Sequence, residues 1–380
     1  MRILIVTSYF PPHVGGVEAV AQRQARVLAA HGHEVAVATG RYDAHLPERA
    51  DEHGYTVWRL PAANPIERRT GVPYPLMGVG FWRGLRRLVR WSEAVHVHDV
   101  LYQPPQAAAL LAVRAGRALF ATQHVGPTNH PHPVVRTVER SVGTVGGRLI
   151  WPRCRRVVAY NARVAAHLRA GGVPEERIWR AEIGVDTTAF APGPADPGLR
   201  ARWGLPGDVP IVLFVGRLVS YKGYRSVLAA AGPGRHVVLA GPGTLDVPLP
   251  PGATSLGPVP ASALPGLYRL ADVFVLPSRG EVFPIVAREA MATGLPVVLT
   301  DGPRYDDYGV DRALLRLIAP EPMPVRAAVD QILADDALRR RMGRYARELA
   351  ERFFDCTVAD DRLLRLYDTV PVAAGRGGAQ

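Results

Sequence analysis

The chain has 380 residues, of which 48% are hydrophobic and 21% charged, and its formal net charge is +12. This composition is typical of a soluble globular protein of about two domains, and no apolar run approaches the ~18 residues of a membrane-spanning helix. The two cysteines, Cys154 and Cys356, are too few for a disulfide framework, which favours a reducing cytoplasm.

The positive charge raises the question of a polyanionic partner. Most arginines alternate with acidic residues, which argues against nucleic acid, because nucleic-acid binding needs a contiguous basic stripe. The exception is FWRGLRRLVRW at 81–91, where Arg83, Arg86, Arg87 and Arg90 share one face of a predicted helix. Two interpretations stay open: the apolar face packs on a sheet, or the helix lies on an anionic membrane surface.

Apolar strands and amphipathic helices alternate along the first half. The opening MRILIVTSYFPP predicts a strand rather than a signal peptide, because its short apolar core runs into a turn. A helix is expected at 17–31. Strands are expected at 3–6, 35–39, 94–97, 118–122, 157–160 and 178–183.

A Pro/Gly-rich stretch at 188–210 interrupts this alternation and predicts a linker. A second series of strands is expected at 211–215, 236–240, 273–276, 297–300 and 314–318. The pattern predicts an α/β protein with two Rossmann-like halves, each a doubly wound parallel sheet. We therefore expect a first domain at 1–187, a linker at 188–209, a second domain at 210–350, a C-terminal helix at 351–370 and a disordered tail at 371–380.

Lys222 is the only lysine of the chain, so arginine has replaced lysine everywhere else. An ammonium group is a compact point charge and is not interchangeable with a planar guanidinium where geometry is tight. Lys222 follows the strand at 211–215, as do Gly216 and Arg217. Two cations at the carboxyl end of such a strand can bind a phosphate in the crevice of an open α/β sheet. The alternative is a surface lysine beside a structural arginine.

The segment SRGEVFPIVAREAMATGLPVVLTD contains Glu281 and Glu289, separated by seven residues. Glu281 is expected in the loop after the strand at 273–276, and Glu289 two turns into a helix that Gly294 and Pro296 end. Carboxylates accept paired hydrogen bonds from vicinal hydroxyls, and a helix start offers free N–H groups to phosphate. The alternative is a solvated helix face with two ordinary glutamates.

These motifs resemble a known family. GRLVSYKGY, ADVFVLPSRGEVFPIVAREAMATGLPVV, YFPPHVGGVEAVAQRQARVLAAHGHEVAVATG and GVDTTAFAP together are similar to the retaining nucleotide-sugar glycosyltransferases of family 4, also called group 1. The resemblance covers both halves and implies the GT-B fold, in which two Rossmann-like domains face each other across a cleft that closes about residues 186–208. It also implies that the final helix, near 358–367, crosses back to the first domain.

The resemblance implies an activity. A hexose or N-acetylhexosamine would move from a UDP- or GDP-linked sugar, with UDP favoured, to a hydroxyl of a small molecule, a glycan or a lipid-linked glycan. No metal and no cofactor beyond the sugar nucleotide is expected, and the enzyme would be cytoplasmic, with contact at the inner face of the membrane as the alternative. The departing phosphate would take the acceptor proton, so no base from the protein is expected.

Roles for single residues also follow from the resemblance. Arg217 and Lys222 match the pair that neutralises the donor diphosphate and thereby stabilises the leaving group. Glu289 matches the carboxylate that binds the donor ribose, and Glu281 the one near the transferred sugar. The expected donor-binding set is completed by Gly216, Phe283, Pro284 and Ile285.

The first half supplies three further candidates. Gly15 and Gly16 match the glycine loop that closes over the donor phosphates and the acceptor, although a simple tight turn would use glycines equally well. His124 matches the active-site histidine that contacts the sugar, with a merely packed histidine as the alternative. The histidines of HVHD and NHPHP are read as a strand end and a loop at the acceptor, rather than as metal ligands: His96, His98, His130 and His132.

Two positions depart from the family. Pro284 stands where many members have glycine, so one backbone N–H to the donor sugar is missing. Ile183 stands where many members have asparagine at the domain junction. Two other functions stay open: a sugar-nucleotide-binding subunit with weak or no catalysis, and a GT-B epimerase, which would need acid and base carboxylates of its own.

Overall fold

The computed structural model describes residues 1–13, 15–63, 65, 76–124, 133–207, 209–279 and 283–370. The chain divides into two compact units. Unit 1 consists of Met1–Ala181 together with Asp360–Gln380, and unit 2 of Glu182–Ala359. Unit 2 therefore begins within the expected first domain (1–187), includes the whole expected linker (188–209) and also includes the start of the last helix.

Unit 1 is built on a sheet in the order β3-β4-β2-β1-β6-β7-β8-β9, with β5 paired to β4. All neighbours are parallel except β3 and β5, which run antiparallel to β4. The parallel strands β1 and β6 are buried along nearly all their length, as expected for strands covered on both faces. The strands are β1 (Arg2–Val6), β2 (Glu34–Arg41), β3 (Arg49–Glu52), β4 (Tyr55–Ala63), β5 (Leu76–Met77), β6 (Ala94–His98), β7 (Ala118–Gln123), β8 (Arg156–Ala159) and β9 (Ile178–Arg180).

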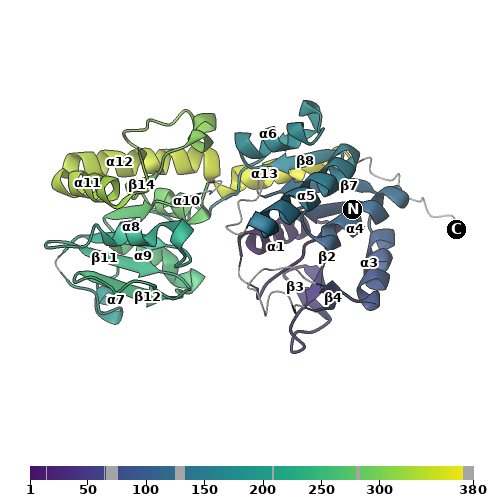
Figure 1. Cartoon of the computed structure of the whole chain (residues 1–380), viewed down its shortest axis with the longest axis horizontal. Helices are drawn as coiled ribbons and strands as arrows, with labels where there is room; N and C mark the ends of the chain where they lie inside the picture. Colours follow the sequence, from purple (N-terminus) through teal and green to yellow (C-terminus); the bar gives the residue numbers. More distant parts are fainter. Residues whose placement is uncertain are drawn as a thin grey trace. The chain divides into compact units, whose positions relative to one another are not determined.

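Helices formed by the described residues accompany this sheet (Figure 1). They are α1 (Gly16–Ala30), α3 (Val79–Trp91), α4 (Gln103–Arg114), α5 (Pro133–Ile150), α6 (Ala162–Ala170) and α13 (Cys356–Tyr367). The apolar face of α3 is buried through Phe81, Leu85, Leu88 and Val89, and the helix contacts β4 and α4. The packing interpretation of this amphipathic helix is therefore confirmed for its apolar face.

Unit 2 has a parallel sheet in the order β12-β11-β10-β13-β14-β15. The strands are β10 (Ile211–Val215), β11 (His236–Ala240), β12 (Ala253–Gly257), β13 (Val273–Leu276), β14 (Val297–Thr300) and β15 (Arg316–Ile318). The helices are α7 (Pro197–Arg202), α8 (Tyr224–Leu228), α9 (Leu264–Leu270), α10 (Ile285–Ala292), α11 (Pro322–Ala334) and α12 (Asp336–Leu349). Both units thus have the mixed α/β, Rossmann-like construction that the sequence predicted.

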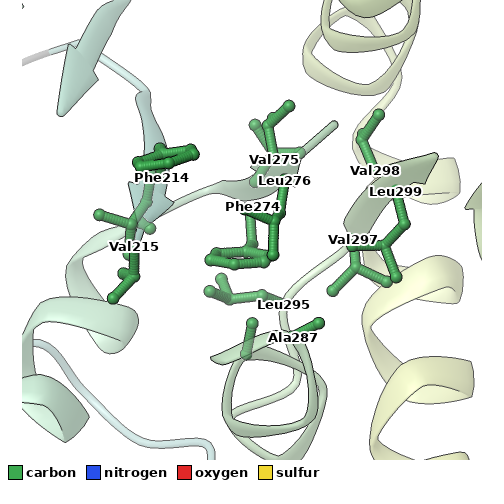
Figure 2. Packing of buried hydrophobic residues seen from close by; sticks show 14 of the residues in the cluster. Phe214, Val215, Phe274, Val275, Leu276, Ala287, Leu295, Val297, Val298 and Leu299 are labelled. Carbon is green, nitrogen blue, oxygen red and sulfur yellow. The ribbon is translucent and has the colours of Figure 1, made fainter. Parts of the chain in front are cut away.

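The core of unit 2 fixes the position of α10. Side chains of β10, β13 and β14 fill both faces of the sheet, and Val215, Phe274 and Val297 lie on the face toward which Ala287 of α10 and Leu295 project (Figure 2). Phe274 and Val297 are fully buried there. Because α10 presents small residues such as Ala287 and Ala290 to this face, it lies close to the strands, and it also contacts α9 and α12.

The segment expected as a linker has structure of its own. Residues 197–202 form α7, whose N-cap Asp196 accepts a hydrogen bond from Gly198 N at 2.9 Å. The Nε atom of Arg269 donates to the carbonyl oxygen of Ala191 at 2.9 Å, and Leu205 is buried. Residues 188–207 are therefore held against unit 2 rather than forming a free tether.

Candidate functional site

Each sheet has a topological switch point at its carboxyl edge, where successive connections leave in opposite directions. In unit 2 this point lies between β10 and β13, and in unit 1 between β1 and β6. Open α/β sheets bind their ligands in the crevice at such a point. The loops that follow these four strands carry most of the described residues that the sequence singled out.

In unit 2 the loop after β10 joins the loop after β13. The carbonyl oxygen of Tyr221 accepts a hydrogen bond from Arg279 N at 2.8 Å. Gly223 has φ +79°, and a Cβ there would overlap the carbonyl group of Pro277. The two loops therefore meet directly at the switch point, and the backbone of one holds the other in place.

Arg217 and Lys222 are gathered around Tyr221. A guanidinium nitrogen of Arg217 donates to the Tyr221 hydroxyl, and the guanidinium carbon lies 5.8 Å from the centre of the ring. The Nζ atom of Lys222 also lies 5.8 Å from this centre. The ring thus orients two cations, and a neighbouring pair of cations is suited to a diphosphate. The sequence did not single out Tyr221, although it stands in SYKGY between the two.

Glycines bring the backbone of this edge close together. Gly216 has φ +155° and Gly241, after β11, has φ +144°. A Cβ at Gly241 would collide with the carbonyl group of Gly216, so only glycine fits at this contact. Leu218 N donates to the carbonyl oxygen of Pro242 at 2.8 Å, which fixes the chain beside Arg217.

Glu289 lies in the second turn of α10, one turn closer to the helix start than expected, because α10 begins at Ile285. Its Oε2 atom accepts a hydrogen bond from the Tyr268 hydroxyl at 2.9 Å. Burial raises the pKa of this carboxyl to about 7 and outweighs the hydrogen bond, which lowers the pKa. A half-buried carboxyl near neutrality is suited to accept hydrogen bonds from hydroxyls that reach it from the crevice.

Phe283 and Pro284 both have structural roles, one in packing and one at the start of a helix. Phe283 is buried between the rings of Tyr305, Tyr308 and Phe354, and the guanidinium carbon of Arg288 lies 5.0 Å from its centre. Pro284 is the N-cap of α10, and Ile285 is the first helical residue. The Phe283 side chain is therefore part of the aromatic core, and only its backbone is available to a ligand. Glu281 lies outside the described residues.

In unit 1 the switch point holds a cavity of about 90 Å³. It is lined from β1 and the following turn, from the start of α1, and from the end of β6: Thr7, Ser8, Tyr9, His13, Val17, Glu18, His98, Asp99 and Tyr102. Asp99 has φ +63°, a conformation that few residues other than glycine adopt. Burial raises the pKa of its carboxyl to about 6, although the Gln123 amide donates to Oδ1 at 2.8 Å.

Gly15 and Gly16 begin α1 beside this cavity. Gly15 is the N-cap, and a Cβ there would collide with the Glu18 carboxylate, which contacts His13 Nδ1 at 2.8 Å. At Gly16 a Cβ would meet nothing within 4 Å. Gly15 therefore leaves room for the Glu18–His13 pair, whereas Gly16 has no comparable steric role.

His124 ends a buried hydrogen-bonded chain. Its Nε2 lies 2.9 Å from His98 Nδ1, and His98 Nε2 lies 2.7 Å from Gln24 Oε1. Gln24 Nε2 donates to the hydroxyl of Tyr367 in α13 at 2.6 Å and lies 2.9 Å from His96 Nδ1. Because an amide oxygen can only accept, His98 carries its proton on Nε2 and accepts through Nδ1 from His124 Nε2–H.

These three histidines are neutral. Burial lowers the pKa of His124 and of His96 to about 3, and lowers that of His98 well below its ordinary value. A neutral His124 with its proton on Nε2 has a lone pair on Nδ1, which can accept a hydrogen bond from a ligand hydroxyl. His96 and His98 are thus parts of a hydrogen-bonded chain, and no metal-binding group of three or more His, Cys, Asp or Glu occurs among the described residues. His130 and His132 lie outside them.

Two Rossmann-like units, each with polar and charged side chains at its switch point, are the construction of a GT-B glycosyltransferase. Comparison with known families gives the same class. Residues 14–189 match the model of Glycosyltransferase Family 4, and residues 196–349 that of Glycosyl transferases group 1. The chain belongs to this glycosyltransferase family.

Curated relatives span almost the whole chain. A GDP-mannose-dependent alpha-mannosyltransferase of Mycolicibacterium smegmatis is 31% identical over 97% of this chain and 98% of its own length. A D-inositol 3-phosphate glycosyltransferase of Catenulispora acidiphila is 30% identical over 96% and 92%.

Solved structures agree in fold. A sucrose-phosphate synthase of Thermosynechococcus elongatus matches with a TM-score of 0.75 at 20% identity over 97% of this chain and 98% of its own. Anabaena HepE in complex with UDP matches with a TM-score of 0.75 at 17% identity over 97% and 100%. At these levels of identity, both matches support the shared fold and no more specific property of this chain.

Proposed function

We propose that this protein is a retaining glycosyltransferase that moves a hexosyl group from a nucleoside diphosphate sugar to an acceptor hydroxyl. The observation that carries the proposal is the pair of cations, Arg217 and Lys222, held around Tyr221 at the switch point of unit 2. A diphosphate leaving group gains negative charge as its bond to the sugar breaks. Cations placed in advance stabilise that charge without reorganisation, which lowers the barrier.

The other residues of this edge fit the rest of the donor. Glu289 would accept hydrogen bonds from the ribose hydroxyls, and the backbone at Gly216 and the start of α10 would approach the phosphates. In the transfer step the bond between sugar C1 and the diphosphate oxygen breaks, and the acceptor oxygen bonds to C1 on the same face. The acceptor proton passes to the departing phosphate oxygen, so atoms and charge balance without a base from the protein.

The donor nucleotide has two candidates, a uridine diphosphate sugar and a guanosine diphosphate sugar. The expectation of a UDP sugar rests on no residue of the sequence that distinguishes uridine from guanosine, and the similarity to a GDP-mannose-dependent relative favours GDP-mannose. We propose GDP-mannose as the first donor to examine, with UDP-glucose and UDP-N-acetylglucosamine beside it.

The test is thermal unfolding with each nucleoside diphosphate and its sugar conjugate, on the wild type and on Lys222→Met. A ligand at 100 times its dissociation constant should stabilise the protein by ~2.7 kcal/mol. The matched control is Arg225→Met, because Arg225 is a cation near the same loop that pairs with Asp246 and lies outside the site. Stabilisation by one base, lost in Lys222→Met and kept in Arg225→Met, would support the proposal. No stabilisation by any of them would contradict it and favour a different activity on this fold.

We also propose that α3 brings unit 1 to an anionic membrane surface. Residues 79–156 contain 12 arginines and only three acidic residues, so the positive excess extends beyond α3 to α4 and α5. Neighbouring helices expose apolar side chains with it: Val79, Trp82, Leu110, Val113, Val145 and Leu149. Among the residues that the structure describes, we find no helix with the length and hydropathy of a membrane-spanning segment.

Each arginine near an anionic bilayer contributes about 1 kcal/mol. Changing Arg83, Arg86 and Arg90 together to Gln should therefore weaken sedimentation with phosphatidylglycerol vesicles by at least about tenfold. In the control, Arg340, Arg341 and Arg344 of α12 are changed to Gln, and sedimentation with the vesicles should change little. Equal binding to phosphatidylcholine vesicles, or equal loss in both variants, would contradict the proposal.

A further inference from the structure

The cavity of unit 1 is lined by hydroxyl, imidazole and carboxyl groups. Thr7, Ser8 and Tyr9 approach it from the end of β1, and His98 and Asp99 from the end of β6. Among the described residues that line it, two are carboxylic acids, Glu18 and Asp99, and none is lysine or arginine. This distribution contrasts with the other edge described above, where Arg217 and Lys222 are gathered for a diphosphate.

The histidine side chains beside these carboxyls supply little positive charge. His98 donates to Gln24 and accepts from His124, and burial holds its pKa far below neutrality, so it is uncharged. His13 is bound to the Glu18 carboxylate at 2.8 Å, so any charge on it is already matched. Glu18 and Asp99 are both nearly inaccessible to solvent, with 7% and 5% exposure, so their field is poorly screened.

An independent observation indicates that a ligand hydroxyl belongs here. The Oγ atom of Ser8 is buried and has no hydrogen-bond partner among the described residues. A buried hydroxyl without a partner destabilises the folded protein, and a bound ligand hydroxyl would remove that cost. Tyr9, Val17 and Tyr102 also line the cavity, so its wall has apolar as well as polar parts, as a polyol with C–H and O–H groups needs.

We infer that this cavity takes an uncharged polyhydroxylated acceptor, and that Asp99 and Glu18 exclude phosphorylated ones. The inference rests on the proposed function, since it names the acceptor class of that transferase. Proteins bind phosphate through Arg and Lys, whose charge and donors match it. Here a phosphate would face two buried carboxyl groups, whereas neutral hydroxyls can donate to them and to Ser8. The chain would differ in this respect from the relatives named for D-inositol 3-phosphate.

The experiment compares neutral probes with their phosphate esters. Binding of myo-inositol and D-inositol 3-phosphate, and of mannose and mannose 6-phosphate, is measured by ligand-observed NMR at pH 8 on the whole protein. In the wild type at least one neutral probe should bind at least about tenfold more tightly than its ester, a difference of ~1.4 kcal/mol. Asp99→Asn and Glu18→Gln should each reduce that ratio several-fold.

The control is Glu34→Gln, because Glu34 is an exposed carboxylate at the start of β2, away from the cavity. This variant should keep the wild-type ratio. The inference is wrong if an ester binds as well as its neutral partner, if no neutral probe binds, or if both site variants keep the wild-type ratio. Thermal stabilisation by nucleotide in the same samples reports separately on the transferase proposal, and an unchanged unfolding temperature without ligand shows that each variant is folded.

Discussion

At the scale of single residues, Glu289 combines a structural cost with a binding role. Its carboxyl has a folded-state pKa of about 7 against an ordinary value of 4.5, because burial penalises the charged form. A raised pKa means that the stability the group contributes is fully present below pH 4.5 and is lost as the pH rises through 7. At pH 8 the folded protein therefore holds a buried charge that glutamine would remove.

We expect Glu289→Gln to unfold at a higher temperature than the wild type at pH 8, by at least about 3 °C, and the difference to shrink towards pH 5. The same variant should lose most of its stabilisation by nucleotide, since the ribose would lose a carboxylate partner. Differential scanning fluorimetry from pH 5 to 8 measures both effects. Glu348→Gln, at an exposed position of α12, should show no such pH dependence. A variant less stable than the wild type at pH 8 would show that the folded state favours the carboxylate.

Which site residues the sequence could identify depended on where they stand in the chain. Arg217 and Lys222 directly follow an apolar strand, so their place at a sheet edge could be read from spacing alone. Tyr268, which holds Glu289, and Tyr221 are ordinary tyrosines in sequence, and only the fold brings them to their partners. Asp99 could be seen in HVHD, but its burial and positive φ depend on the turn after β6.

At the scale of elements, α13 closes over the histidine chain of unit 1. The Tyr367 hydroxyl is buried between Gln24 Nε2 at 2.6 Å and His96 Nδ1 at 2.7 Å. Tyr367→Phe would leave both groups buried without this partner, at a cost of about 1–3 kcal/mol. Asp360→Asn, which removes a half-exposed ion pair with Arg23, should cost about 0–1 kcal/mol.

Urea unfolding of the two variants measures this difference, with the slope against denaturant checked in each case. A second measurement is the nitrogen NMR spectrum of the histidines. If Tyr367 fixes the tautomers through Gln24, the signals of His96 and His98 should change in Tyr367→Phe and stay in place in Asp360→Asn. Equal costs for the two variants would mean that the hydroxyl has no special role.

The central strands predicted from the sequence are those whose burial leaves a continuous apolar run. Ile3–Val6 and Ile211–Val215 are such runs, and both form central strands. The strands not predicted lie towards sheet edges: β4 reads YTVWRLPAA with an internal proline, and β12 reads ATSLG and is only half-buried. At an edge the pairing partner, rather than the apolar run, decides whether a segment becomes a strand.

At the scale of the whole molecule, the two units have separate sheets and separate carboxyl edges. The large apolar cluster that includes Phe214 and Phe274 runs from Val185 to Phe354 and belongs entirely to unit 2. A ligand held by unit 2 should therefore stabilise that unit without directly stabilising the strands of unit 1. Hydrogen exchange can observe this, because core amides exchange only when their unit opens.

We expect a nucleoside diphosphate at 100 times its dissociation constant to slow exchange in β10 and β13 by up to ~100-fold, which is the factor set by linkage. Exchange in β1 and β6 should change little. Unit 1 does not hold the ligand, so binding does not raise the free energy of its opening when it opens by itself. Lys222→Met should abolish the slowing in β10, and Arg225→Met should retain it. Equal slowing in both sheets would mean that the two units open together, so that one free energy of unfolding describes the whole chain. Slowing confined to β1 and β6 would mean that unit 1 binds the nucleotide. That result would overturn the assignment of Arg217 and Lys222 to the donor site.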